Sequence, residues 1–409
     1  MLCHGLRNLR CGTLLLQTLA GPVDHRLRLR FFFTAHRFHR LSFVKSSISL
    51  PNKHLQTTQR SKRSVSTSQK TIKRIGVLTS GGDAPGMNAA LRAVVLAAEH
   101  YGIETIAFRH GYQGLLDNDA VPMQAKDVLH ILQYSGTIIK SARCRRFKEV
   151  EAAQLAAKNL DSLNIDALIV IGGDGSFRGA DHLANHWQGQ IIGVPGTIDN
   201  DVYGTDQTIG YATAVAIAMD ALDKIRDTAD AMDRVFIVEV MGRDAGFIGL
   251  CSAMSSGAER MILPELQKEK ALTISALVKH IKRVQEIRGE GSYVMVLSEH
   301  QWPGGAVALS EQLEAEYHLP CRPCLLGHIQ RGGPPAPADR ILASELGVHA
   351  VELILAGAHR VMAAKSQNAC VAVPLRETWE KKHPLDENLL RIQHEIFNPV
   401  KKKQQRAAL

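Results

Sequence analysis

The 409-residue sequence is poor in cysteine, in aromatic residues and in long apolar runs. Its seven cysteines are few and odd in number, which excludes a disulfide framework and favours a reducing compartment. No stretch approaches the roughly eighteen uninterrupted apolar residues that a membrane-spanning helix needs. With 45% hydrophobic residues, however, the chain is too apolar to be mainly disordered, and it is long enough for two domains.

Acidic residues are almost missing from residues 1–70, which hold thirteen lysines and arginines and one acid, Asp24. An Arg- and Ser-rich composition without acids is typical of an organelle transit peptide, and the apolar residues Leu14–Leu16 make a secretory signal a second option. We favour a disordered extension without a role in the chemistry, and a cytoplasmic protein. The remainder of the chain has slightly more acids than bases, so nucleic-acid binding is not expected.

From Lys73 onward, short continuous apolar runs alternate with longer stretches of helical spacing. The runs predict strands at Arg74–Thr79, Ile103–Phe108, Ala167–Ile171, Ile191–Val194, Val235–Val240, Tyr293–Leu297 and Cys370–Val373. Helices are predicted from Asn88 to about His100 and at Val150–Leu163, Thr213–Asp227, Ile274–Ile287 and Ala338–Leu355. Continuous apolar strands indicate a sheet covered on both faces, which predicts a parallel, doubly wound α/β architecture. Ligands bind such sheets at the carboxyl ends of the strands.

Two glycine-rich loops follow predicted strands, Ser80–Asn88 and Gly172–Ser176. Paired glycines before a helix let the backbone approach a phosphate, although a simple tight turn explains the first loop equally well. Asp174 in the second loop suits Mg²⁺ beside phosphate oxygens, or alternatively a helix N-cap. The chain has no G-x-x-x-x-G-K-[ST] motif, so neither loop is a P-loop.

An acidic loop and a basic loop complete the pattern. Pro195–Asp201 places two carboxylates and a hydroxyl at a strand end, and Gly327–Gly333 contains a histidine and an arginine that suit a phosphate. A surface turn and a solvated arginine are the alternative explanations. The C-x-x-C of Cys321 and Cys324 lacks the second pair of ligands that a zinc site needs. Together the loops indicate phosphoryl transfer from a magnesium nucleotide to a phosphorylated acceptor.

The motifs GGDAPGMN, GGDGS, PGTIDND, VEVMGR and GHIQRGG, in this order, closely resemble those of the bacterial-type ATP-dependent 6-phosphofructokinases over about residues 71–357. The resemblance implies two doubly wound, mostly parallel-sheet domains that are discontinuous in sequence. Residues 71–209 plus about 331–380 would bind ATP, and residues 210–330 plus about 381–409 would bind the sugar phosphate. The implied reaction is the phosphorylation of fructose 6-phosphate to the 1,6-bisphosphate, the committed step of glycolysis, with Mg²⁺.

The resemblance also implies roles for single residues. Asp199 matches the general base, with Thr197, Arg143 and Arg243 around the transferred phosphoryl group. The implied ATP contacts are Gly82, Arg143, Cys144, Gly173, Asp174, Gly175 and Ser176, and Asp174 is also the implied metal ligand. The implied sugar-phosphate contacts are Thr197, Ile198, Asp199, Arg234, Met241, Gly242, Arg243, Glu299, Arg322, His328, Ile329, Gln330 and Arg331. Arg234 and Arg322 match arginines that reach the sugar phosphate from a neighbouring subunit, which implies a homotetramer with shared active sites.

Departures from the family pattern define the alternatives. Pyrophosphate-using relatives are expected to have Asp in place of Gly175 and Lys in place of Gly196, so both glycines favour ATP. An inactive nucleotide sensor would lack Asp174 or Asp199, and an NAD kinase would not need the GHIQRGG loop. In the adenine region, Cys144 replaces a frequent aromatic residue, and Lys148 and Ala153 replace arginines.

A second, effector-binding site is implied by Arg92, Arg226 and Glu259, and there Arg288 stands in for a lysine. Leu96 replaces an expected arginine and Glu290-Gly291 replace two expected lysines. We therefore predict a weak or absent response to a nucleotide diphosphate or phosphoenolpyruvate, the effectors that the resemblance implies.

Overall fold

The computed structural model describes residues 71–269, 272–289, 291–398 and 400, which all belong to one compact unit. The extension predicted over residues 1–70 lies outside them, as does Glu290.

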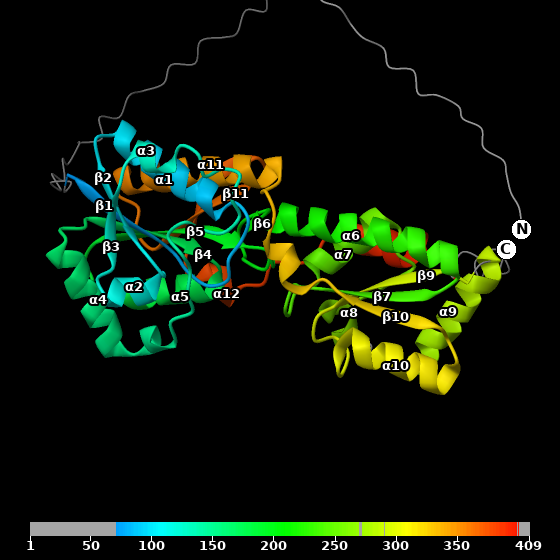
Figure 1. Ribbon diagram of the computed structural model, residues 1–409. Helices are drawn as coiled ribbons and strands as arrows, with labels where there is room; N and C mark the ends of the chain where they lie inside the picture. The colour runs from blue at the N-terminus through cyan, green and yellow to red at the C-terminus, as the bar shows by residue number, and fades with distance from the viewer. Residues whose placement is uncertain (1–70, 270–271, 290, 399, 401–409) are drawn as a thin grey trace, which may run out of the picture. The chain divides into compact units, whose positions relative to one another are not determined.

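In the described part of the chain, eight strands form a first sheet with the order β12-β11-β5-β4-β1-β2-β3, to which β6 is added beside β5 (Figure 1). Their bounds are β1 Arg74–Thr79, β2 Glu104–Phe108, β3 Ala120–Met123, β4 Ala167–Gly172, β5 Gln190–Thr197, β6 Ile209–Gly210, β11 Val361–Ser366 and β12 Ala369–Pro374. The central pairs β2–β1, β1–β4, β4–β5 and β5–β11 are parallel. The parallel centre brings the carboxyl ends of β1, β4 and β5 to one edge.

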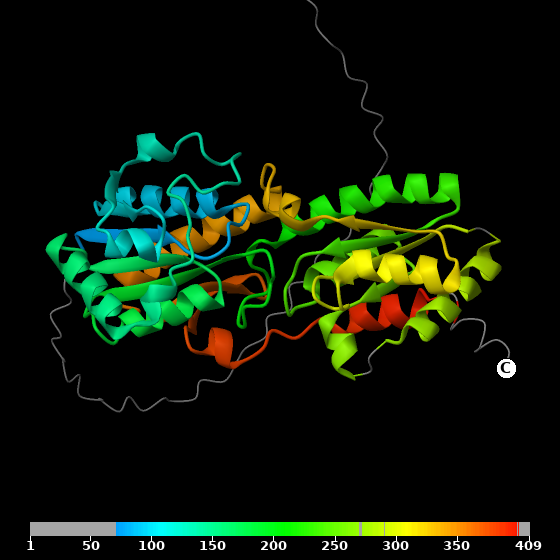
Figure 2. The same cartoon turned by 60° about the horizontal axis from the view of Figure 1, so that its bottom comes forward.

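A second sheet of four described strands, all parallel, has the order β10-β7-β9-β8. It lies in the green-to-yellow part of the chain in Figure 2. Its bounds are β7 Val235–Val240, β8 Arg260–Ile262, β9 Tyr293–Ser298 and β10 Cys321–Leu325. The two sheets share one apolar core, since a single cluster joins Ile75 and Val77 of β1 to Val238 and Val240 of β7.

The helices cover both faces of each sheet. Over the first sheet, α1 and α11 pack on one face and α2, α4 and α5 pack on the other. Alternate side chains of β4 belong to the two apolar clusters on these faces, Ile169 to the one with α1 and α11 and Leu168 to the other. The bounds are α1 Met87–His100, α2 Tyr112–Leu116, α3 Ala125–Val128, α4 Val150–Ser162, α5 Asp174–Leu183, α6 Tyr211–Met232, α7 Phe247–Ser256, α8 Pro264–Glu269, α9 Ile274–Arg288, α10 Gly305–Tyr317, α11 Pro337–Leu355, α12 Glu377–Glu380 and α13 Glu387–Arg391, with short helices η1 Arg145–Lys148, η2 Gly327–Arg331 and η3 Ile392–Ile396.

The predicted doubly wound α/β class is confirmed, and each predicted strand and helix exists with bounds shifted by a few residues. The expectation of a covered parallel strand at Cys370–Val373 is wrong. There β12 pairs antiparallel with β11 at the sheet edge, and its side chains are exposed or half-buried. Its short apolar run therefore reflects an edge position and not a core strand.

The cysteines at 144, 251, 321, 324 and 370 are free thiols. Cys321 is buried and Cys324 half-buried on β10. None of the helices within the described ranges combines the length and the apolar character needed to cross a membrane.

Candidate active site

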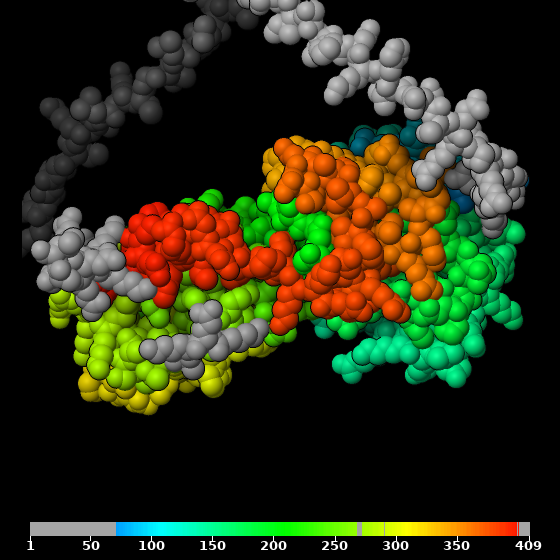
Figure 3. Space-filling model, turned by 180° about the vertical axis from the view of Figure 1, so that it is seen from behind, coloured from blue at the N-terminus to red at the C-terminus, as the bar shows by residue number. Residues whose placement is uncertain are grey.

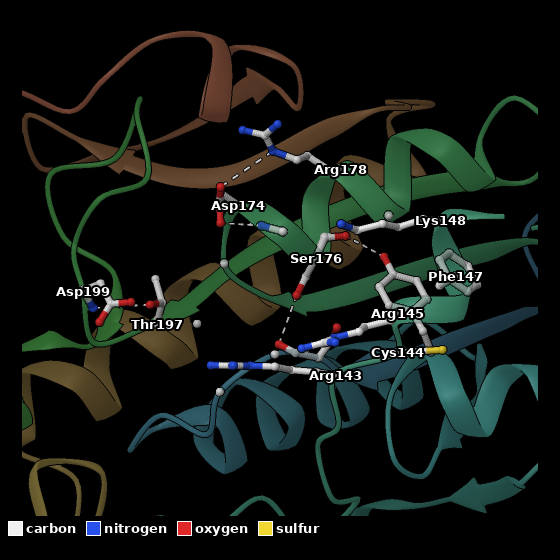
Figure 4. A pocket seen from close by; sticks show the side chains of 18 of the residues that line it. Arg143, Cys144, Arg145, Phe147, Lys148, Asp174, Ser176, Arg178, Thr197 and Asp199 are labelled. Atoms are coloured by element: carbon white, nitrogen blue, oxygen red, sulfur yellow. Dashed lines mark hydrogen bonds and ion pairs between the residues drawn. The ribbon is translucent and has the colours of Figure 1, made fainter. Parts of the chain in front are cut away.

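A cavity of about 720 Å³ lies where the loops after β1, β4 and β5 meet residues that follow strands of the second sheet. From the predicted site it gathers Gly82, Arg143, Cys144, Gly173, Asp174, Gly175, Ser176, Thr197, Asp199, Arg243 and Arg331. Figure 4 shows Thr197 and Asp199 at one end of this pocket and Cys144 and Phe147 at the other. The two glycine loops, the acidic loop and the basic loop therefore border a single space.

The two glycine loops are tied to each other. Ser176 donates through Oγ to the Ser80 carbonyl at 3.1 Å, and Tyr112 donates through its hydroxyl to the Ser176 carbonyl at 2.6 Å. A Cβ at Gly82 would lie 2.9 Å from Nη1 of Arg331, so a larger residue there would displace the guanidinium group from its present position. Arg331 donates to the Asp83 carbonyl at 2.7 Å and is therefore a built-in part of the pocket, not a solvated turn residue.

Asp174 is the first residue of α5, and Gly173 occupies the N-cap position. The alternative of Asp174 as N-cap is thus wrong. Its Oδ2 lies 3.7 Å from Nε of Arg178, one turn further along the helix, and its carboxylate is partly exposed to the pocket. The negative charge at the helix start is favourable and remains accessible to a cation.

The acidic loop holds a deeply buried carboxylate. The Asp199 side chain is 3% exposed, its Oδ2 lies 3.5 Å from Nε of Arg243, and its Oδ1 has no hydrogen-bond partner among the described residues. Burial raises the pKa of Asp199, although Arg243 and Arg331 act in the opposite direction. A buried carboxylate oxygen without a partner is suited to accept a proton from a bound hydroxyl.

Asp201 also lines the pocket and belongs to the same crowded set of carboxylates. Burial, followed by the charges of Asp199 and Asp174, raises the pKa of Asp201 to about 6. The described residues contain no group of three or more His, Cys, Asp or Glu side chains arranged to hold a metal by themselves. Crowded carboxylates beside a phosphate loop nevertheless fit Mg²⁺, which usually takes one or two carboxylates together with substrate phosphates and water.

The loop after β7 is held by the half-buried Glu299 and the buried Gln330. The Glu299 Oε1 accepts hydrogen bonds from the backbone N–H groups of Gly242 (3.2 Å) and Arg243 (2.8 Å). Gln330, which is completely buried, accepts from the Met241 N–H at 2.8 Å. Arg243 has a φ of 51°, an uncommon left-handed conformation that its backbone contacts with Glu299 help to maintain. Glu299 and Gln330 thus fix the loop that presents Arg243.

The end of the pocket opposite Asp199 differs from the sequence prediction at single residues. Phe147 stacks on Tyr112 with ring centroids 4.0 Å apart, and Cys144 and Lys148 line the cavity. Ala153, by contrast, is fully buried in α4 and does not reach it. Sequence reasoning missed Tyr112, Arg145, Arg178 and His182, all of which line the cavity. Helical spacing from Asp174 would have indicated Arg178, whereas nothing near Tyr112 pointed to a site.

Several predicted contacts do not line the cavity. Ile198 is buried in the core, His328 and Ile329 are exposed, and Arg322 forms an ion pair with Glu314 at 2.6 Å. Arg234 directly precedes β7, whereas Met241 directly follows it, and a strand of this length spans about 20 Å. Arg322 lies at the same amino-terminal end, since β10 runs parallel to β7 with Cys321 opposite Val235. Within one chain, Arg234 and Arg322 therefore lie about the length of a strand away from Arg243.

The residues of the predicted effector site are mostly paired with each other. Arg226 donates two hydrogen bonds from Nη1 and one from Nη2 to the Glu259 carboxylate, and Arg288 forms a further ion pair with it. The Val294 N–H also donates to Glu259 at 2.7 Å. Arg92 lies on α1 with its Nε buried and without a partner in the described residues.

Comparison with known proteins supplies the remaining observation. Residues 74–354 match the sequence profile of the family described as phosphofructokinase. The chain is 45% identical to ATP-dependent 6-phosphofructokinase 1 of Thermus thermophilus, over 78% of this chain and 98% of that protein. The crystal structure of phosphofructokinase from Pichia pastoris superposes with a TM-score of 0.69 at 36% identity, over 76% of this chain but 36% of the yeast chain. A pyrophosphate-dependent phosphofructokinase from Marinobacter aquaeolei, at 21% identity and a TM-score of 0.70 over 78% of this chain and 86% of its own, shares the fold.

Proposed function

The chain belongs to the phosphofructokinase family, and we propose the residues by which it transfers the terminal phosphoryl group of ATP to fructose 6-phosphate. The observation that carries the assignment is the shared pocket, in which two glycine loops meet Asp199 beside Arg243, with the Asp199 Oδ1 left without a hydrogen-bond partner among the described residues. Phosphoryl transfer asks little covalent chemistry of a protein, so positioning and positive charge are its main contributions.

The first-sheet side of the pocket is proposed to bind ATP. The backbone of Gly82 and of Gly173–Ser176 would lie along the phosphates, and Arg143 and Cys144 would border the nucleotide. Asp174 would hold Mg²⁺, with Asp201 nearby. The ion supplies charge neutralisation to the phosphates when it is bound.

The proposed transfer step uses Asp199 as the base. Its Oδ1 would accept the proton of the sugar 1-hydroxyl as that oxygen attacks the terminal phosphorus of ATP, and ADP leaves. Arg143 and Arg243 would offset the charge on the transferred phosphoryl group, with Thr197 beside them. The Asp199 N–H lies 3.3 Å from Oγ1 of Thr197, which is consistent with a shared loop conformation that holds both groups.

The second-sheet side is proposed to bind the sugar phosphate through Met241, Gly242, Glu299, His328, Ile329 and Arg331, while Gln330 and the backbone around Ile198 position their neighbours. Arg234 and Arg322 lie at the opposite end of β7 and β10. For this reason we propose that they serve the site of a second copy of the chain. A homotetramer with shared sites would satisfy this requirement.

The division into an ATP-binding part (71–209 plus about 331–380) and a sugar-phosphate-binding part (210–330 plus about 381–409) belongs to the same proposal. Its support is sheet membership, since β1–β6, β11 and β12 form one sheet and β7–β10 the other. We also propose a cytoplasmic location, which the free thiols favour.

ATP is favoured over pyrophosphate as the donor by the open space at Gly175, because a Cβ built there meets nothing within 4 Å in the described part of the chain beyond its own neighbours along the helix. An aspartate at that position would enter the pocket and occupy space that the glycine leaves open for the adenosine part of ATP. The presence of Asp174, Thr197, Asp199 and Arg243 in one pocket disfavours an inactive paralogue.

A coupled assay of the full chain with fructose 6-phosphate and Mg²⁺ tests the donor, comparing ATP with pyrophosphate. The proposal expects turnover with ATP and little with pyrophosphate. The reverse preference would identify the pyrophosphate-dependent enzyme, and no turnover with either donor would favour a nucleotide sensor.

A further inference from the structure

The segment after β12 carries a histidine, His383, that contacts elements from both sides of the pocket. Its Nδ1 lies 2.9 Å from the carbonyl oxygen of Asn200, and its ring packs on the Phe247 ring with centroids 4.8 Å apart. Asn200 separates Asp199 from Asp201, and Phe247 is the first residue of α7, directly after the loop that presents Arg243. Figure 3 shows the chain after β12, in orange to red, running across the surface from the first-sheet part to the second-sheet part. His383 itself is not among the residues that line the pocket.

The Asn200 carbonyl defines how His383 must be protonated. A carbonyl oxygen can only accept a hydrogen bond, so Nδ1 must carry the proton. Burial lowers the pKa of His383, whereas the Asn200 carbonyl and the charge of Asp206 act to raise it. A neutral ring that is protonated at Nδ1 agrees with the lowered pKa and donates to the Asn200 carbonyl. A charged ring would donate through the same nitrogen.

Asn200 is a conformationally demanding position. It is 3% exposed and has a φ of 55°, in the left-handed region that asparagine tolerates better than most residues. Its side-chain Oδ1 accepts from the Thr208 N–H at 2.8 Å, and the Thr208 hydroxyl donates to the Thr197 carbonyl at 2.6 Å. Thr208 thus holds the side chain of Asn200, and His383 holds its carbonyl. Together they define the turn between the two carboxylates.

We propose that His383 is a positioning residue for the phosphoryl transfer: its Nδ1–H fixes the Asn200 carbonyl, while its ring rests on Phe247. The catalytic loop and the loop of Arg243 would then keep the spacing that puts Arg243 Nε 3.5 Å from Asp199 Oδ2. This inference rests on the proposed role of Asp199 as base.

Two substitutions separate the donor from the ring. His383→Asn retains an N–H close to the position of Nδ1 but loses the ring, and His383→Phe retains the ring but loses the donor. If the hydrogen bond positions the loop, His383→Phe lowers kcat by about 10- to 100-fold, because small misplacements of reacting groups are costly. His383→Asn keeps kcat within about threefold, and the KM for ATP stays unchanged in both. The melting temperature should fall more in His383→Asn than in His383→Phe, because only His383→Asn loses the packing of the ring on Phe247.

His359 provides a matched control. Its Nδ1 accepts a hydrogen bond from the Ile191 N–H at 3.1 Å, far from the catalytic loop along β5. His359→Phe should lower the melting temperature without lowering kcat. The proposal is overturned if His383→Phe keeps kcat within threefold of the parent, or if His383→Asn loses as much turnover as His383→Phe.

An Asp199→Ser variant measured in parallel tests the underlying function separately. If Asp199→Ser retains turnover, the assignment of the base fails and the role of His383 fails with it. If Asp199→Ser loses turnover while His383→Phe does not, the base stands and only the role of His383 is removed.

Discussion

The two sides of the pocket differ in how much of the site a single chain supplies. On the first-sheet side, the loops after β1, β4 and β5 end at one edge, and hydrogen bonds of Ser176 with Ser80 and Tyr112 tie the loop after β4 to the loop after β1 and to α2. On the second-sheet side, Arg243 and Arg331 reach the pocket while Arg234 and Arg322 lie at the opposite end of their strands, and we propose that this side is divided between two copies of the chain. Parallel strands bring residues together only at a common end, which is why the proposal assigns Arg234 and Arg322 to the site of another copy of the chain.

The largest effect is expected from removing the base on the first-sheet side. Asp199→Ser should lower kcat by about 10²–10⁴-fold, the usual loss for a general base, while the KM for fructose 6-phosphate changes much less. Steady-state kinetics with both substrates measure this. Turnover close to that of the parent would remove Asp199 from its role.

A second substitution tests whether the first-sheet side alone selects the donor. Gly175→Asp should fold normally, because a Cβ there meets no atom within 4 Å. Placing its carboxylate beside the phosphates costs several kcal/mol, so kcat/KM for ATP should fall by about 10²–10³-fold. Gly175→Ala is the matched control, and an equal loss in that variant would show that space and not charge is decisive.

The divided side is tested through Arg322. Removing a charge-assisted contact with the sugar phosphate should raise the KM for fructose 6-phosphate by about 10- to 100-fold in Arg322→Ala, with little change in the KM for ATP. Glu314→Gln removes the partner of Arg322 within the chain and should not raise that KM. An unchanged KM in Arg322→Ala would show that the arginine does not bind substrate.

Mixing subunits then asks where Arg322 acts. In a mixture of the Arg322→Ala and Asp199→Ser chains, some hybrid sites combine an intact Asp199 with an intact Arg322 from the partner. Activity should rise above that of either variant alone. If native mass spectrometry shows hybrids and activity does not rise, the sites are not shared.

The sequence could predict the parts of the site that lie in loops at strand ends, but not the residues whose positions depend on neighbours distant in sequence. The glycine and acidic loops were found because each follows a continuous apolar strand, and parallel strand ends must converge. The sequence pattern could not show that Ile198 points into the core or that Gln330 holds the Met241 backbone, because neighbours distant in sequence decide both. His383 lies beyond the short helix α12 and not at the end of a strand, and it carries no motif, so its contact with Asn200 emerges only from the folded chain. Likewise, the exposed edge position of β12 depends on its pairing with β11.

The pH dependence of activity tests the opposing effects of burial and of nearby arginine charges on the pKa of Asp199. Burial raises its pKa, and a protonated carboxyl cannot accept the hydroxyl proton, so kcat/KM for fructose 6-phosphate should fall as the pH decreases. The acid limb should lie above the ordinary aspartate range. Because the charge of Arg331 lowers the pKa of Asp199, Arg331→Gln should move the limb to higher pH. A limb at the ordinary aspartate value, or one unmoved in Arg331→Gln, would contradict this electrostatic description.

The smallest effect is expected at the second, effector-type site that the family resemblance implies, where the two sheets again differ. On the second-sheet side, Arg226 and Arg288 are already paired with Glu259, whereas Arg92 on α1 has an unpartnered Nε in the described residues. Leu96 and Gly291 offer no charge where cations are expected. Glu290 replaces a third expected cation, and charge-assisted contacts contribute about 1.5–3 kcal/mol each, so losing three weakens phosphate binding by about 10³-fold or more. Titrating ADP or phosphoenolpyruvate to millimolar concentration at limiting fructose 6-phosphate should therefore change the rate little. Strong activation or inhibition that Arg92→Ala or Arg226→Ala abolishes would show instead that the effector site survives these losses.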